Sequence, residues 1–225
     1  MKNFYYYPPL IFQKVAYIVF YIIYRAVVGI EIVGKENLRG IKGPLIIAAN
    51  HTHEADVTIA PLIVGFFSKL YPIYFVANPK GKIETTSTWK KYLYGGLFFN
   101  FLGGYPIHPG YQDYSHSLEK HLELLRQGRT VLIFPEGKRT LDGKLNPARG
   151  GLGYMVYTTK AAVLPVVIDT FFNITILNSL TSRRKIKITI LKPISANELM
   201  TTQIPGVEDF RLASQVVMDR IREKL

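Results

Sequence analysis

Beyond residue 29 the sequence alternates short apolar runs with amphipathic stretches, and this alternation restricts the fold more than any other feature. Short runs rich in Val, Ile and aromatic residues are typical of strands, and apolar residues three or four apart are typical of helices. The predicted strands are 31–33, 45–49, 73–77, 105–107, 130–134, 164–168 and 186–191. The predicted helices are 57–67, 89–101, 114–127, 152–160 and 207–223. This pattern predicts an α/β fold with a mostly parallel or mixed sheet that is covered by helices.

The length of 225 residues fits one domain of this class, which we expect to span residues 30–225. The chain contains no cysteine. Disulfides, thiolate metal sites and a cysteine acyl-enzyme are therefore excluded.

The segment 1–29 has the composition of a membrane-associating helix. Only ten apolar or aromatic residues lie between Lys14 and Arg25, whereas a spanning helix needs about 20. Helical spacing places Lys14, Arg25 and several tyrosines near one face and Val and Ile side chains on the others. Tyrosine and basic residues are typical of a helix that lies in the membrane interface, which we expect here. A spanning helix and a plain buried helix stay open as alternatives.

The charge and the hydropathy of the chain also indicate a membrane. The formal net charge is +12, yet the mean hydropathy is +0.12 and 13% of the residues are aromatic. These properties predict an anionic membrane surface as a partner and a location at the cytoplasmic face. Nucleic acid would attract the same charge, but the sequence contains no helix-turn-helix, ribonucleoprotein or phosphate-loop motif, so we expect no nucleic-acid partner.

His51 and Asp56 follow the predicted strand 45–49 and form the first candidate site. A histidine that a carboxylate orients can act as a general base near neutral pH. Five residues along a regular helix turn through about 140°, so both side chains cannot lie on one helical face. We therefore expect His51 in the turn after the strand and Asp56 at the start of the next helix. The alternative is that His51 packs at the strand end and Asp56 favours a helix N-terminus.

A second candidate site follows the predicted strand 130–134. It contains Glu136, Gly137, Lys138 and Arg139, and open α/β sheets bind ligands at the carboxyl ends of their strands. Glycine lets a ligand approach the backbone, and the cations could neutralise a phosphate. An ordinary charged turn is the alternative.

Four segments in this order, residues 50–56, 103–110, 134–140 and 163–167, resemble the blocks of the glycerolipid acyltransferase family, which includes lysophosphatidate acyltransferases. The first matches Asn-His-x-x-x-x-Asp, and the third matches Phe-Pro-Glu-Gly-x-Arg-Ser/Thr. The second and fourth blocks are weaker patterns, built mainly from glycine, proline and apolar residues. The resemblance covers about residues 30–191 and implies a fold like that of glycerol-3-phosphate acyltransferases.

The resemblance implies direct transfer of a fatty acyl group to a lysophospholipid acceptor, with 1-acylglycerol-3-phosphate giving phosphatidic acid as the first candidate. His51, held by Asp56, would deprotonate the acceptor hydroxyl, which attacks an acyl-CoA or acyl carrier protein thioester. Glu136 and Gly137 would position the glycerol, and Arg139 the phosphate. The resemblance implies no cofactor and no metal.

The second block departs from the family, because His108 and Pro109 stand where an arginine is common. We still expect His108 to bind the acceptor, and Arg139 or Arg149 would then neutralise more of the charge of its phosphate. Another lysolipid acceptor therefore stays an alternative.

The sequence leaves two other classes of protein open, a metallohydrolase and a non-catalytic lipid-binding module. His51-Thr52-His53 matches the start of a metallohydrolase motif, but Ala55 and Val57 occupy the positions of its next ligands. The basic cluster 183–187 would suit a non-catalytic lipid-binding module, or an acidic carrier protein. Turnover of an acyl donor would distinguish the enzyme from such a module.

Overall fold

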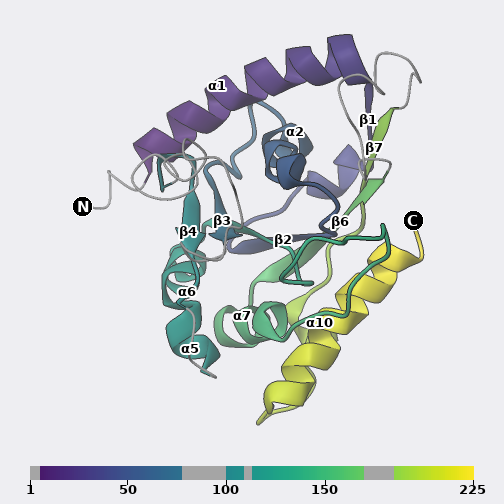
Figure 1. Cartoon of the computed structure of the whole chain (residues 1–225). Coiled ribbons are helices and arrows are strands. Elements are labelled where there is room, and N and C mark those ends of the chain that lie inside the picture. The colour runs from purple at the N-terminus through teal and green to yellow at the C-terminus, as the bar shows by residue number, and fades with distance from the viewer. Residues whose placement is uncertain (1–5, 78–99, 109–112, 170–184) are drawn as a thin grey trace.

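The computed structural model describes residues 6–77, 100–108, 113–169 and 185–225 (Figure 1). Most of the predicted helix 89–101, and Arg183 and Arg184 of the basic cluster 183–187, lie outside these residues. Seven strands occur in the described part: β1 (Ile30–Val33), β2 (Leu45–Ala49), β3 (Ile73–Ala77), β4 (Gly104–Pro106), β5 (Thr130–Ile133), β6 (Ala162–Asp169) and β7 (Ile186–Ile190). Each matches a predicted strand to within about two residues at either end, so the strand predictions are confirmed.

The strands form one sheet in the order β1-β7-β6-β2-β5-β3-β4. All neighbouring pairs are parallel except β6 and β7, which are antiparallel, so the sheet is mixed as predicted. β2 and β5 are central neighbours, with Leu45 opposite Thr130. Their carboxyl ends therefore open at the same edge of the sheet.

Helices cover both faces of the sheet (Figure 1). They are α1 (Tyr7–Ile23), continued by a π-helical turn to Val28, η2 (Lys35–Leu38), η3 (Glu54–Thr58), α2 (Ala60–Val64), α5 (Tyr114–Ser117), α6 (Glu119–Arg126), α7 (Gly151–Thr159), α9 (Ala196–Leu199) and α10 (Val207–Arg222). Figure 1 shows α1 and α2 on one face and α5, α6, α7 and α10 on the other. Alternate residues of β2 enter the two cores, with Leu45 and Ile47 on the α1 side and Ile46 and Ala48 on the other. This α/β architecture confirms the predicted fold class.

Two predicted helices are shorter than expected. The helix expected over 57–67 is the 3₁₀ turn η3 followed by α2, which begins beside Pro61 and ends at Gly65, a residue with φ of 81°. The helix expected over 114–127 is divided at Leu118 into α5 and α6. There the carbonyl of Ser117 accepts a hydrogen bond from the His108 amide. A contact to the segment that follows β4 thus replaces a contact within the helix.

Helix α1 is joined to the sheet through a buried glutamine. Gln13 is 2% exposed, its Nε2 donates to the carbonyls of Ile73 (2.6 Å) and Leu102 (2.9 Å), and its Oε1 accepts from the Ile73 amide (2.9 Å). A side chain at Gly103 would collide with this amide, because a Cβ there would lie 2.8 Å from Nε2. One face of α1 is therefore bonded to β3 and to the start of β4.

The opposite face of α1 is apolar and exposed. Its exposed side chains include Ile11, Val15, Ile18, Val19 and Ile22. The helical stretch Tyr7–Ala26 is long and apolar enough to cross a membrane by length and composition. The exposed face of α1 is more apolar than the spacing of the tyrosines in the sequence predicts, because Tyr17 and Tyr24 turn toward the protein.

Replacing Gln13 with leucine should lower the free energy of unfolding by about 2–5 kcal/mol, because backbone groups of β3 and of the residue before Gly103 would lose their buried partner. Denaturant unfolding followed by circular dichroism measures the change. The exposed Gln127, changed to leucine in parallel, should shift stability by less than about 0.5 kcal/mol. Equal midpoints for the two variants would show that the glutamine does not hold α1.

His121, on α6, is fully buried, and burial lowers its pKa to about 4. The unfolded chain binds this proton near the usual value of 6.5, so unfolding becomes more favourable as the pH falls from about 6.5 to 4. The loss should approach about 3 kcal/mol and stop below pH 4. The free energy of unfolding should change less with pH across this range for His121→Gln than for the wild type. The substitution of an exposed histidine, His116→Gln, should retain the wild-type pH dependence. Identical slopes for all three proteins would refute the assignment.

Candidate active site

The first two candidate segments meet at the carboxyl edge of the sheet, where β2 and β5 end side by side. The backbone amide of His51 donates to Oε1 of Glu136 (2.8 Å). The carbonyl of His51 accepts from the amide of Thr140 (2.9 Å). Both backbone groups of the histidine are therefore held by the loop that follows β5.

His51 and Asp56 form a side-chain pair. Nδ1 of His51 lies 2.8 Å from Oδ2 of Asp56, which also accepts from the amides of Thr52 (2.7 Å) and His53 (2.9 Å). Backbone amides can only donate, so Oδ2 is an acceptor and Nδ1 must carry the shared proton. This tautomer leaves the lone pair of the imidazole on Nε2.

The two members of the pair differ in their access to solvent. The side chain of Asp56 is 0% exposed, whereas that of His51 is 22% exposed. Asp56 sits in η3, the tight turn that its own hydrogen bonds to the preceding amides help to close. The expected positions are confirmed: the histidine lies in the turn after the strand and the aspartate at the start of the helical region.

Phe134 stacks on the imidazole. The two ring centroids are 4.1 Å apart and the planes differ by 12°. The aromatic ring therefore covers one face of His51 and restricts its rotation. Phe134 opens the third family-like segment, residues 134–140, and the pattern of that segment gives no sign of this contact.

Glu136 is buried, and both of its carboxylate oxygens accept hydrogen bonds within the protein. Oε1 binds the His51 amide, and Oε2 accepts from the amide (2.7 Å) and the side chain (3.1 Å) of Asn146. Sequence reasoning missed Asn146, which lies ten residues away in a loop that has no periodic pattern. In this structure the carboxylate joins two loops around the histidine.

Gly137 and the nearby arginines form the exposed side of the same loop. Gly137 has φ of +66°, a backbone conformation that favours glycine, and a Cβ there would lie 2.7 Å from Cδ of the flexible Arg149 side chain. The amide of Arg149 donates to the Pro135 carbonyl (2.8 Å), and its side chain is exposed. Arg139 is partly exposed. Cations therefore occupy the loop that holds the histidine backbone.

Asn50, which precedes the histidine, is fully buried and joins β2 to β6. Its side chain donates to the Ile168 carbonyl (2.9 Å) and accepts from the Ile168 amide (2.8 Å). The fourth candidate segment lies in β6, directly beside β2. The first, third and fourth segments are thus brought together in the middle of the sheet.

His108 lies apart from this group. It follows β4, which is the outermost strand and is separated from β2 by β5 and β3. Its side chain is exposed, and its ring lies 5.6 Å from that of His116. Pro109 lies outside the described residues. The acceptor-binding roles of His108, Glu136, Gly137 and Arg139 stay predictions.

Among the residues that the structure describes, no group of three or more His, Asp and Glu side chains is placed to hold a metal ion. The two histidines of the His51-Thr52-His53 motif therefore have no third such ligand in this part of the chain. Nδ1 of His51 is already bonded to the aspartate.

Known proteins are similar to this chain in both sequence and fold. A model of the acyltransferase family matches residues 29–169. A Mycoplasma pneumoniae protein named probable 1-acyl-sn-glycerol-3-phosphate acyltransferase is 28% identical over 163 residues, which are 72% of this chain and 58% of the relative. A protein of the same name from Mycoplasma genitalium is 29% identical over 165 residues, with 73% and 58% covered. The chain thus spans less than two thirds of these relatives.

The crystal structure of the 1-acyl-sn-glycerophosphate (LPA) acyltransferase PlsC from Thermotoga maritima is similar with a TM-score of 0.62. The match covers 96% of this chain and 79% of that chain at 21% identity, so it shows a shared fold. The family model, in turn, covers well over half of the chain. The chain therefore belongs to the acyltransferase family.

Proposed function

We propose that this protein transfers a fatty acyl group from an acyl thioester to the free hydroxyl of a lysophospholipid. The first candidate acceptor is 1-acylglycerol-3-phosphate, which would give phosphatidic acid. The observation that carries the proposal is the 2.8 Å contact between Nδ1 of His51 and the buried carboxylate of Asp56. Family membership and the names of the two Mycoplasma relatives support it.

The reaction begins with proton transfer to Nε2 of His51, the imidazole nitrogen that carries the lone pair. As the acceptor O–H bond breaks, its oxygen forms a bond to the thioester carbon and a tetrahedral oxyanion develops. Collapse of this intermediate breaks the C–S bond, and the leaving thiolate takes up the proton. Asp56 accepts a hydrogen bond from Nδ1–H throughout and stabilises the imidazolium that forms between these steps.

Positioning of the base supplies a further part of the rate. Proton abstraction by a placed base contributes about 10²–10⁴-fold, so orientation and stabilisation of the oxyanion must supply the rest. The loop after β5 fixes the backbone of His51 and Phe134 restricts its ring. Arg139 would bind the acceptor phosphate, and Glu136 and Gly137 would shape the glycerol site beside it.

The acyl donor is a thioester of coenzyme A or of acyl carrier protein, both of which are cytosolic, so the site would work at the cytoplasmic face of a membrane. Helix α1 would lie in the interface rather than span the bilayer. One of its faces is bonded to β3 through Gln13, and only the other, with Ile11, Val15 and Ile18, is free to meet lipid. The net charge of +12 favours an anionic surface.

Purified full-length protein, offered labelled acyl-CoA and acyl carrier protein thioesters in turn, tests the proposal. Each donor is paired with lysophosphatidate, glycerol 3-phosphate and lysophospholipids that carry larger headgroups. We expect labelled phosphatidic acid as the fastest product. Preference for a larger headgroup would support another lysolipid acceptor, the alternative that the His108-Pro109 departure leaves open. Absence of turnover with every pair would contradict the proposal.

A further inference from the structure

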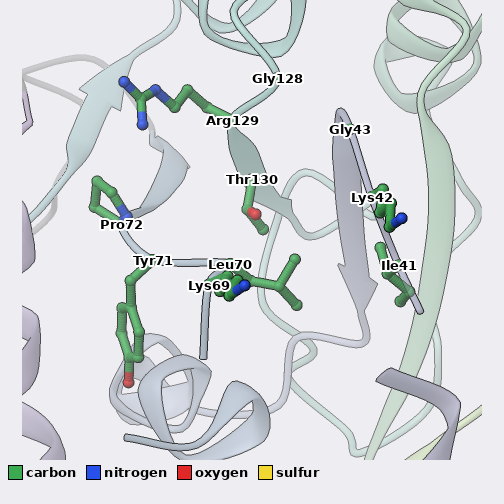
Figure 2. A pocket seen from close by; sticks show the side chains of 10 residues that line it. All are labelled: Ile41, Lys42, Gly43, Lys69, Leu70, Tyr71, Pro72, Gly128, Arg129 and Thr130. Carbon is green, nitrogen blue, oxygen red and sulfur yellow. The ribbon is translucent and has the colours of Figure 1, made fainter. Parts of the chain in front are cut away.

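A pocket lies at the amino ends of the parallel strands β2, β3 and β5 (Figure 2). His51 follows the carboxyl end of β2, so the pocket lies at the opposite edge of the sheet. Its cavity has a volume of about 270 Å³. Three loops form it, and they precede β2, β3 and β5: residues 41–43, 69–72 and 128–130. At about 3.3 Å per residue, the five residues of β2 separate this pocket from the histidine by about 16 Å.

Three cations and no carboxylate line this pocket. Each loop contributes one cation, namely Lys42, Lys69 and Arg129, and the ten lining residues include no Asp or Glu. The buried hydroxyl residue Thr130 lies between Arg129 and Leu70 in Figure 2. Within the described part of the chain, none of the three cations has a carboxylate oxygen within 4 Å. Unpaired positive charge around one concave surface attracts anions.

The amino-terminal half of α1 borders this pocket. Arg129 lies over the ring of Tyr6 (4.5 Å to the centroid), and Lys14 lies over the ring of the lining residue Tyr71 (4.5 Å). The helix whose outer face is apolar thus contacts two residues of the cationic pocket. A membrane that received this outer face would bring its phosphate layer close to the pocket mouth.

We propose that this pocket, which we call the amino-edge pocket, is a phosphate-binding site separate from the active site. A phosphate oxygen would receive charge-assisted hydrogen bonds from Lys42 and Lys69, and Arg129 would add a third positive charge to the lining. The neighbouring α1 favours the phosphate of an anionic lipid headgroup over a free phosphate. Such a contact would orient the domain on the membrane, and it does not depend on the acyl-transfer chemistry.

Sedimentation with lipid vesicles tests the proposal with the full-length protein. The variant combines Lys42→Gln and Lys69→Gln, both exposed positions, so the fold should persist. A control of equal charge combines Arg211→Gln and Lys224→Gln, exposed cations on or just beyond α10. Vesicles of phosphatidylcholine are compared with vesicles that also contain about one-fifth phosphatidylglycerol. In a second arm, inorganic phosphate is added and the thermal unfolding midpoint is measured.

Because a lysine near an anionic surface contributes about fivefold in affinity, the Lys42/Lys69 variant should bind the anionic vesicles about 25-fold more weakly. Its binding to phosphatidylcholine alone should be unchanged, and the control should lose less than about twofold. If inorganic phosphate instead raises the midpoint of the wild type but not of the variant, while vesicle binding is unchanged, the pocket binds free phosphate. A variant that matches the control in both arms would overturn the phosphate site. Neither readout requires turnover, so failure of the proposed acyl transfer would be seen separately.

Discussion

Replacing His51 with alanine should lower kcat by about 10²–10⁴-fold while the protein remains folded. The imidazole is partly exposed, and its Nδ1 is bonded to the buried carboxylate of Asp56, which leaves Nε2 to accept the proton of the acceptor hydroxyl. Its backbone contacts to Glu136 and Thr140 survive the substitution, so the loops around it should keep their positions. Steady-state kinetics with a saturating acyl thioester measure the effect, and circular dichroism checks the fold.

His53 provides the matched control for this experiment. It is the neighbouring histidine, and its contribution to the pair is a backbone amide that donates to Asp56, which alanine would retain. His53→Ala should therefore keep kcat within about threefold of the wild type, an effect of less than about 1 kcal/mol. Comparable losses in the two variants, or near-normal transfer by His51→Ala, would contradict a specific base at His51.

Replacing Glu136 with alanine should lower both stability and kcat. The buried amides of His51 and Asn146 would lose their shared acceptor, at a cost of about 3–5 kcal/mol in the free energy of unfolding. Loss of the backbone contact would also let His51 move, and a displacement of about 1 Å can cost about 10²-fold in rate. Glu136→Gln, which keeps the shape and one carbonyl oxygen, should fall between the wild type and the alanine variant.

The same variants distinguish the two roles of Glu136. If the carboxylate holds the histidine loop, the unfolding midpoint and kcat should fall together and the KM for the acceptor should change little. If it instead binds the glycerol of the acceptor, that KM should rise while stability stays near the wild-type value. The second pattern would refute the positioning role that its buried hydrogen bonds indicate.

The central strands β2 and β5 could be predicted because each is an uninterrupted buried run. The pairing of His51 with Asp56 could be predicted because their spacing requires a turn. The division at Leu118 could not be predicted, because it depends on a hydrogen bond between His108 and Ser117 from separate elements. The spacing of apolar residues along a helix does not predict a hydrogen bond to a neighbouring segment.

Other features of the site depend on contacts across the sheet. Glu136 was identified from its motif, but its partner Asn146 and the stacking of Phe134 on the imidazole became visible only when β5 was placed beside β2. Gln13 gave no signal in a segment that is otherwise apolar, and its backbone partners lie 60 and 89 residues away. The amino-edge pocket likewise combines three loops that are distant in the sequence.

The fate of the acyl group in one reaction tests most directly whether the protein transfers it to the lipid with His51 as the base. Labelled acyl thioester and lysophosphatidate are incubated with the wild type and with His51→Ala, and the released thiol and the labelled lipids are quantified together. We expect one labelled phosphatidic acid for each thiol that the wild type releases, and little of either product from the variant. Release of labelled free fatty acid in place of phosphatidic acid, or equal product from both proteins, would contradict this expectation.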